Sequence, residues 1–470
     1  MSFIFYDTET TGTNTTFDQI LQFAAIKTDH ELRELERFEI RCRLLPHVVP
    51  SPGAIRVTGI TVEQLTNSSL PSHYQMVCAI NAKLKEWSPA IFIGHNSLSF
   101  DEHLLRQALY KSLHPPYLTN TNGNCRSDSL RIIQAAHHYV PGILSVPVDE
   151  KGKQTFRLDR LAPANAFRQG SFHDAMGDVE AMIHMSRLVA ERTESHWSNF
   201  VRFAQKAAIL DFTEEEEVFA LSDFYYSKAY TWMVTTIGAN PEYSSELIVF
   251  NLSVDPEDLV ALTDDDLADR LITYPKPVRA MRANACPCVL CYEDTPVHLR
   301  AQVPEIGELT RRAAYIKRDE TLAQRLIAAF LRMRRKREPS IHVEEQIYDS
   351  FTGNHDQALM EKFHVTEWCD RANLLVQLTD QRMKTLGERL IYIEAPDVMA
   401  AQDRGNHQIN ISRRLMAPEG SVPWLTLPKA TAETNNLLTV SVGAEAALLS
   451  DLRDYLIQRS EEAGAMLLMV

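Results

Sequence analysis

The chain has 470 residues, of which 45% are hydrophobic and 23% charged, as in a soluble globular protein of two or three domains. Its first residues lack a basic region, and no stretch approaches the roughly 20 apolar residues of a membrane helix, so we expect no signal peptide and no membrane partner. The net charge of −14 excludes a uniformly basic surface but not a local basic groove. Seven cysteines, an odd number, predict reduced thiols and a cytoplasmic location.

The first part of the chain, residues 1–195, is predicted to be an α/β domain. Short apolar or β-branched runs predict strands at residues 2–6, 20–28, 37–45 and 90–94. Helical periodicity predicts helices at residues 61–65, 74–87, 100–110, 130–139 and 174–191. Residues 146–155 are polar and predict a loop.

The middle part, residues 196–345, is predicted to be a small, mostly β domain. Strands are expected at residues 225–237 and 246–254, with a further pair within 278–290, and an acidic helix at 264–271. The acid run at 214–217 is interpreted as a solvated helix end. From about residue 309 onward the chain is predicted to be helical, with helical signals at 322–333, 355–365, 371–386 and 444–459. Residues 346–470 are predicted to form a C-terminal helical domain.

Asp7 and Glu9 follow the first predicted strand at alternate positions. Residues i and i+2 of a strand point to the same face, so these two carboxylates can converge on one point. Two facing carboxylates repel each other unless a cation lies between them, and Mg²⁺ and Mn²⁺ prefer such oxygen ligands. The pair alone is common in proteins and does not establish a site.

Two further acids lie at helix starts. Asp101 follows a predicted strand, and the helix dipole alone would explain an acid there. Asp178 lies one turn into a helix, between Met176 and Val179, where a carboxylate needs a partner. With His173 five residues before Asp178, the order D-x-E, N-x-x-x-F-D and H-x-x-x-x-D resembles the signature of the DEDDh 3′→5′ exonucleases.

The chemistry of phosphodiester hydrolysis explains these residue types. Two divalent ions about 4 Å apart can generate the hydroxide nucleophile and stabilise the charge on the phosphoryl and leaving oxygens. We expect Asp7 to bridge both ions, Glu9 and Asp178 to complete the first, and Asp101 to support the second. His173 can accept the proton of the attacking water, because its pKa lies near working pH.

Longer segments of the chain closely resemble the bacterial exodeoxyribonuclease I family, namely residues 3–7, 22–29, 52–61, 156–161, 164–165, 173–178, 284–287 and 346–351. The resemblance implies a ribonuclease H-like nuclease domain, a central SH3-like domain and a C-terminal helical domain that together form a clamp around single-stranded DNA. It also implies processive 3′→5′ release of 5′-mononucleotides in DNA repair, with two Mg²⁺ ions that Mn²⁺ can replace.

The same resemblance implies substrate contacts and a partner. Substrate contacts are expected from Glu9, Thr10, Asn96, Arg126 and Arg157. The implied protein partner is the acidic C-terminal tail of single-stranded DNA-binding protein, and we expect the enzyme to be a monomer.

Two other features of the sequence have open interpretations. Ten basic residues lie between Arg311 and Arg337 with only two acids among them, and they form either a solvated helix face or a surface that follows the phosphates of DNA. Three cysteines at 286, 288 and 291 lack a fourth zinc ligand at a suitable spacing, so we expect them to be structural.

Three other functions remain open from the sequence. An RNA-directed trimming enzyme of the same superfamily would share the five residues but would leave residues 200–470 unexplained. A non-catalytic nucleic-acid-binding subunit would be indicated by the loss of a carboxylate, and none is lost. A structural scaffold has no sequence feature in its favour.

Overall fold

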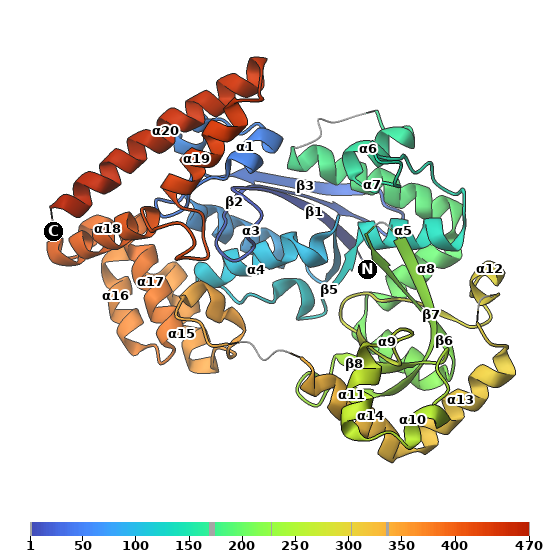
Figure 1. Cartoon of the computed structure of the whole chain (residues 1–470). Helices are drawn as coiled ribbons and strands as arrows, with labels where there is room; N and C mark the ends of the chain where they lie inside the picture. The colour runs from blue at the N-terminus through green and yellow to red at the C-terminus, as the bar shows by residue number, and fades with distance from the viewer. Residues whose placement is uncertain (1, 169–173, 227, 302, 335–337, 470) are drawn as a thin grey trace.

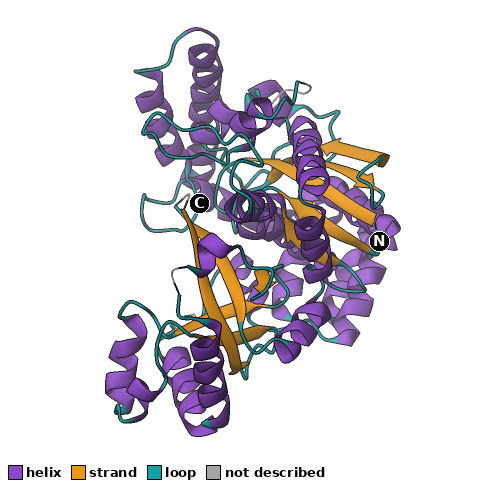
Figure 2. Ribbon diagram, turned by 90° about the vertical axis from the view of Figure 1, so that its right-hand side faces the viewer, coloured by secondary structure: helices purple, strands orange, loops and turns teal. Residues whose placement is uncertain are grey.

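The computed structural model describes residues 2–168, 174–226, 228–301, 303–334 and 338–469. Two sheets and three groups of helices make up this part of the chain (Figures 1 and 2). None of its helices has the combination of length and apolar character needed to cross a bilayer.

The first sheet has the strand order β3-β2-β1-β4-β5. Its strands are β1 (Ser2–Thr10), β2 (Ile20–Thr28), β3 (Glu34–Arg41), β4 (Ala90–Gly94) and β5 (Cys125–Asp128). β1 pairs antiparallel with β2 and parallel with β4, which in turn is parallel to β5. The carboxyl ends of β1, β4 and β5 therefore lie at one edge of the sheet, where open α/β sheets bind their ligands.

Helices cover both faces of this sheet. The helices of this part are α1 (Pro52–Thr58), α2 (Val62–Thr66), α3 (His73–Trp87), α4 (Asp101–Lys111), α5 (Ser129–Tyr139), α6 (Leu158–Ala164), α7 (Ala175–Arg192), α8 (Glu194–Phe203) and α9 (Lys206–Glu215). Phe3 and Phe5 of β1 share a core with α5 and α7, whereas Ile4 and Tyr6 share a core with α3 and α4. This alternation follows from the two-residue period of a strand, and it decides which side chains of β1 face α7.

The second sheet is antiparallel, in the order β10-β6-β7-β8-β9. Its strands are β6 (Phe219–Tyr225), β7 (Lys228–Ala239), β8 (Glu246–Asn251), β9 (Val278–Arg282) and β10 (Cys288–Cys291). The helices of this part are α10 (Glu257–Val260), α11 (Asp264–Ile272), α12 (Val297–Arg300), α13 (Ile306–Arg318) and α14 (Glu320–Arg332). One face shares its core with α11, α13 and α14 and the other with α9, and α8 contributes residues to both cores.

The last part of the chain is helical. It contains α15 (Asn354–Val365), α16 (Trp368–Gln377), α17 (Gln381–Glu394), α18 (Ala401–Leu415), α19 (Leu427–Leu438) and α20 (Gly443–Leu468). Short 3-10 helices occur at η1 (Ser97–Ser99), η2 (Leu118–Asn120), η3 (Val343–Tyr348) and η4 (Pro396–Val398). α15 and α17 pack against Tyr74 and Tyr110 of the first part, and α19 and α20 pack against Ile55 and Leu65. The C-terminal helices are therefore attached to the first part of the chain (Figure 1).

Three strand predictions need correction. The third strand begins at Glu34 rather than residue 37, because its exposed charged residues hide the strand pattern. The predicted strand at 225–237 covers only the last residue of β6 together with most of β7. β6 was not predicted as a separate strand. Two strands exist within 278–290, but β9 and β10 lie at opposite edges of the sheet and do not pair with each other.

Candidate active site at the carboxyl end of the first sheet

Three of the predicted acids converge. Asp7 and Glu9 continue the face of β1 that carries Phe3 and Phe5, so both point toward α7, which carries Asp178. One carboxylate oxygen of each acid lies within 4.8 Å of the others, close enough for one cation to bind all three.

Asp101 reaches the site from the other face of the sheet. It begins α4, it is only 3% exposed, and its Oδ1 accepts a hydrogen bond of 2.5 Å from the Thr8 hydroxyl. Thr8 lies between Asp7 and Glu9 on the strand, and its side chain therefore faces α4. The alternation of β1 thus places carboxylates on one face and a positioning hydroxyl on the other.

The electrostatics of the cluster favour a cation. Burial and the charges of Asp178 and Asp101 raise the pKa of Glu9 to about 8. Burial and the neighbouring acids also raise the pKa of Asp7, and burial raises the pKa of Asp101 to about 6. Buried like charges of this kind require either protonation or a bound positive ion. An all-oxygen donor set suits a hard divalent cation.

The N-terminus of α7 is held in place by an ion pair and a hydrogen bond. Asp174, the N-cap of α7, accepts hydrogen bonds of 2.7 Å from Arg41 and 2.8 Å from Gln22, which reach it from two strands. These contacts hold the first turn of α7, and with it Asp178, against the sheet. His173 lies outside the described residues, so its role as proton acceptor stays a prediction.

A cavity of about 420 Å³ opens beside Asp178. Asn96 and Arg157, two of the predicted substrate contacts, line this cavity together with His95 and Phe156. The Arg157 side chain is 67% exposed and pairs with the neighbouring Asp159 at 3.1 Å. An exposed guanidinium near a carboxylate cluster is well placed to bind a phosphate.

Asp128 holds the rim of this cavity. Its two carboxylate oxygens accept hydrogen bonds from the backbone N–H groups of Asn96 and Leu98, at 2.8 and 3.2 Å. Asn96 has a φ of 62°, in the left-handed region that asparagine tolerates better than most residues. Asp128 ends β5 and was not anticipated, although an acid at the end of a strand and before a helix was a possible signal.

Two further predicted substrate contacts, Thr10 and Arg126, have structural partners. The Thr10 hydroxyl donates to the carbonyl oxygen of Gly12 at 2.8 Å. Arg126 is 9% exposed, and its guanidinium donates to Glu102 and to the carbonyl of Asn284, each at 3.1 Å. Substrate contacts from Thr10 and Arg126 therefore stay predictions.

Comparison with known proteins places this site in a family. Residues 4–185 match the family described as Exonuclease, and residues 341–459 match the family described as Exonuclease I C-terminal domain. Exodeoxyribonuclease I of Escherichia coli strain K12 is 27% identical over 403 residues, which cover 82% of this chain and 84% of that protein. Exodeoxyribonuclease I of Haemophilus influenzae is 28% identical over 303 residues, 61% of this chain and 63% of that protein.

The chain is a homologue of exodeoxyribonuclease I. Solved structures agree in fold along nearly the whole chain. The exonuclease I of Methylocaldum szegediense has a TM-score of 0.84 at 25% identity and covers 98% of this chain and 99% of its own. Escherichia coli exonuclease I in complex with a dA16 oligonucleotide has a TM-score of 0.85 at 24% identity, with 97% and 99% covered.

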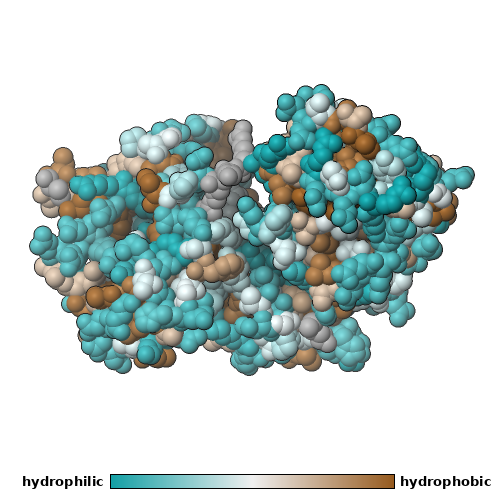
Figure 3. Space-filling view, turned by 90° about the horizontal axis from the view of Figure 1, so that it is seen from below, coloured by the Kyte–Doolittle hydropathy of each residue, from teal (hydrophilic) through white to brown (hydrophobic). Residues whose placement is uncertain are grey.

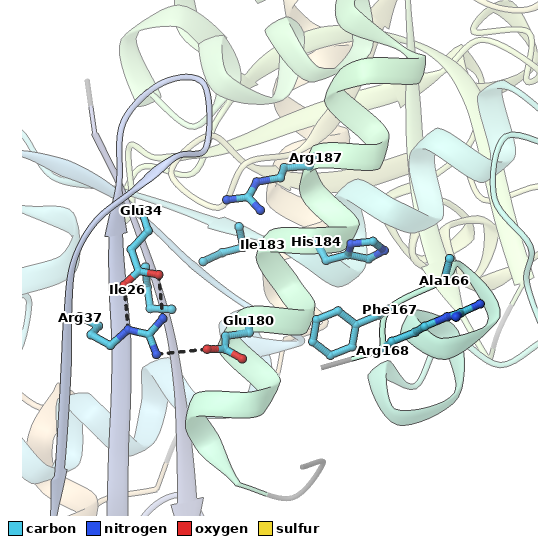
Figure 4. A pocket seen from close by; sticks show the side chains of 10 residues that line it. All are labelled: Ile26, Glu34, Arg37, Ala166, Phe167, Arg168, Glu180, Ile183, His184 and Arg187. Atoms are coloured by element: carbon cyan, nitrogen blue, oxygen red, sulfur yellow. Dashed lines mark hydrogen bonds and ion pairs between the residues drawn. The ribbon is translucent and has the colours of Figure 1, made fainter. Parts of the chain in front are cut away.

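A second cavity near α7 is separate from the site. It has a volume of about 360 Å³ and is lined by Glu34, Arg37 and Glu180, among others. In Figure 4 the Arg37 guanidinium reaches both glutamates. None of the four predicted acids lines it, so we assign it no part in the chemistry.

Four arginines of the basic segment form ion pairs within their own part of the chain. Arg311 pairs with Asp255, Glu257 and Glu308. Arg312 pairs with Glu308, and Arg325 pairs with Asp264. Arg334 pairs with Glu246 of β8. These contacts favour a solvated, ion-paired helix face over a free phosphate-binding surface for these four arginines. Residues 335–337 lie outside the described residues.

The three cysteines of the middle part are buried or half-buried and belong to the packing. Cys288 and Cys291 are the ends of β10, and the Ser127 hydroxyl donates to the Cys286 sulfur at 3.3 Å. Among the residues that the structure describes, these thiols form no metal-ligand group.

Proposed function

We propose that this enzyme is a processive 3′→5′ exonuclease that degrades single-stranded DNA to 5′-mononucleotides. The observation that carries the proposal is the convergence of Asp7, Glu9 and Asp178 in the part of the chain that matches the exonuclease family. The family membership of the C-terminal part gives the proposal its substrate, because the relatives that match over most of the chain are exodeoxyribonucleases.

The residues fit a site for two Mg²⁺ ions, which Mn²⁺ could replace. Asp7, Glu9 and Asp178 would hold the first ion, with Asp7 shared, and Asp101 would support the second. Bound ions of this kind supply a hydroxide nucleophile and stabilise the leaving 3′ oxygen. His173 would take the proton of the attacking water. The clustering of buried acids with raised pKa values supports this assignment.

The cavity beside Asp178 would bind the last nucleotides of the strand. Arg157 would pair with a backbone phosphate, and Asn96 at the rim would contact the terminal nucleotide, with Glu9, Thr10 and Arg126 as further contacts. The Escherichia coli relative has been crystallised with a dA16 oligonucleotide, and the same fold here supports a single-stranded substrate.

The three parts of the chain would work as one clamp. We propose a nuclease domain at 1–195, an SH3-like domain at 196–345 and a helical domain at 346–470. The antiparallel five-stranded second sheet supports an SH3-like assignment. Seen from below, the surface shows two bulky parts with a hollow between them (Figure 3), as a clamp around a strand would need.

We also propose the enzyme's setting in the cell. Seven unpaired cysteines suit a reducing, cytoplasmic compartment. A monomer would be sufficient, because all the predicted acids come from one chain. The acidic C-terminal tail of single-stranded DNA-binding protein is the proposed partner.

A test of the proposed activity uses a single-stranded DNA labelled at either end. With Mg²⁺, the 5′-labelled strand should shorten into a ladder, and the 3′-labelled strand should release its label as a mononucleotide at once. EDTA and an Asp178→Ala variant should each stop the reaction. An Asp211→Ala variant, in which an exposed acid on α9 is removed, is the matched control and should keep full activity. Cleavage that persists in Asp178→Ala would refute the carboxylate site, and release from the 5′ end would refute the polarity.

A further inference from the structure

His95 lines the cavity beside Asp178, between the end of β4 and the segment that carries Arg157. It directly follows Gly94, the last residue of β4, and it is half-buried. The two-ion chemistry proposed for the carboxylates makes no use of its imidazole. Each ring nitrogen contacts a different segment of the chain, so the ring lies where three parts of the cavity wall meet.

Hydrogen bonds fix the orientation and the tautomer of the His95 ring. Its Nε2 lies 3.0 Å from the carbonyl oxygen of Phe156, which can only accept, so Nε2 carries the proton. Burial lowers the pKa of His95, so the ring is neutral at neutral pH and Nδ1 carries a lone pair. The hydroxyl of Ser129, 3.1 Å away, can donate to this lone pair. The ring therefore bridges the first turn of α5 and the carbonyl of Phe156.

The Phe156 carbonyl belongs to the peptide group that leads into Arg157. Arg157 is the N-cap of α6, and its guanidinium is exposed beside the cavity. The Phe156 ring is only 8% exposed and packs edge-on against His137, which fixes the side chain. The hydrogen bond from His95 acts on the peptide group itself. The orientation of that peptide sets the direction in which the Arg157 side chain leaves the backbone.

The same ring is tied to the opposite rim of the cavity. Asp128 accepts a hydrogen bond of 2.8 Å from the backbone N–H of Asn96, the residue after His95. Ser129, the residue after Asp128, is fully buried and contacts the His95 ring. Asp128 and Ser129 therefore hold both residues against the start of α5. Through His95, the two predicted substrate contacts Asn96 and Arg157 are held at a fixed separation.

We propose that His95 is a positioning residue that holds Arg157 in place to bind a backbone phosphate of single-stranded DNA. The inference rests on the proposed function and deepens it, because it assigns the residue that sets the geometry of one substrate contact. Phosphate contacts fix the register of a nucleic acid on a protein, so a shift of this guanidinium would weaken the hold on the strand.

Three substitutions separate the hydrogen bond to Phe156 from the packing of the ring. His95→Phe fills nearly the same space and removes both hydrogen bonds. His95→Gln can place its Nε2–H close to the position of the histidine Nε2–H, so it keeps the donor to the Phe156 carbonyl. His95→Asn is shorter and reaches only the position of Nδ1, so it is the matched control for His95→Gln.

Steady-state kinetics on single-stranded DNA test the positioning role. His95→Phe should raise the KM about fivefold, as expected for the loss of one hydrogen bond, with kcat within about twofold of the wild type. His95→Asn should match it, and His95→Gln should stay within about twofold of the wild type. In an Arg157→Ala background His95→Phe should add nothing, because the phosphate contact is already lost. An unchanged KM in His95→Phe, or an equal rise in both backgrounds, overturns the proposal.

The salt dependence of binding separates a phosphate contact from a general loss of packing. Equilibrium binding of single-stranded DNA is measured in EDTA over a range of salt concentrations. The slope of log affinity against log salt should decrease by about 0.7 in His95→Phe and in Arg157→Ala, the value for one phosphate contact to a single strand. Affinity that falls in His95→Phe with an unchanged slope overturns the proposal.

Hydrogen exchange on the DNA-free protein tests the contact independently of the proposed function. Peptides that cover residues 155–161 should exchange faster in His95→Phe and His95→Asn, and at the wild-type rate in His95→Gln. Unchanged exchange in His95→Phe overturns the proposal, whatever the activity. If exchange changes as expected but the wild type does not shorten single-stranded DNA, the proposed function is refuted while the contact stands. Ser129→Ala, which removes only the donor to Nδ1, should show a smaller increase in exchange and in KM. It replaces His95→Phe if that variant does not fold, and wild-type values for both overturn the proposal.

Discussion

Replacement of Glu9 by glutamine is expected to abolish nuclease activity while stabilising the metal-free protein. Burial and the charges of Asp178 and Asp101 raise the pKa of Glu9 from 4.5 to about 8. The charged form is therefore disfavoured in the folded protein. One pKa unit corresponds to about 1.4 kcal/mol, so at pH 7 Glu9, which is ionised in the unfolded chain, lowers the stability of the fold by up to roughly 3 kcal/mol. Glutamine has nearly the same shape and no charge.

The pH dependence of this effect has a definite sign. Below pH 4.5 the carboxyl is protonated in both the folded and the unfolded chain, so it costs nothing. The cost grows as the pH rises from 4.5 toward the folded pKa of about 8 and is constant above it. The stability gain of Glu9→Gln should therefore be large at pH 7 and should vanish near pH 4.5.

Urea unfolding in EDTA measures this gain, and Glu63→Gln, which changes an exposed acid of α2, is the matched control. Wild-type protein should be stabilised by Mg²⁺, whereas Glu9→Gln should respond much less, because the cation no longer offsets the same repulsion. A Glu9→Gln protein no more stable than the wild type in EDTA at pH 7 would refute the reasoning, as would full nuclease activity in that variant.

Thr8→Val removes the hydroxyl that donates to the buried Asp101. A lost hydrogen bond to a charged group costs about 1.5–3 kcal/mol, so kcat should fall roughly 10- to 100-fold in single-turnover assays. An unchanged kcat would contradict the positioning role of Thr8. Arg126→Met leaves the buried Glu102 with one arginine partner fewer. Urea unfolding should show that the free energy of unfolding falls by about 3 kcal/mol. An unchanged stability with a raised KM would instead show that Arg126 binds the substrate. Arg157→Ala should raise the KM for single-stranded DNA about tenfold and reduce the salt dependence of binding, and a fall in kcat at constant KM would exclude a phosphate contact.

The geometry of the carboxylate cluster was largely predictable because it follows from strand periodicity. The two-residue period of β1 places Asp7 and Glu9 on one face, and the structure adds Asp178 from α7 to the same point. The same period places Thr8 on the opposite face, where it donates to Asp101, but the sequence does not say which helix covers that face. The contact between Thr8 and Asp101 could therefore not be predicted from the sequence.

Long-range partners account for what the sequence could not predict. Asp174 and Arg41 are 133 residues apart, and Arg126 reaches Asn284 across 158 residues. Such pairs depend on how whole elements pack, and local patterns carry no signal for them. The basic segment shows the same limit, because two of the three acids that pair with Arg311, and the acid that pairs with Arg325, lie 54 to 61 residues earlier in the chain.

The central claim is that this exodeoxyribonuclease I homologue degrades single-stranded DNA, and the most direct measurement is a competition between DNA and RNA. Matched 5′-labelled DNA and RNA strands of one sequence are mixed with the wild-type protein and Mg²⁺, and the two initial rates of 3′ shortening are compared. The account predicts that the DNA shortens far faster than the RNA. Equal or faster shortening of the RNA would contradict it, even if the carboxylate site proved correct.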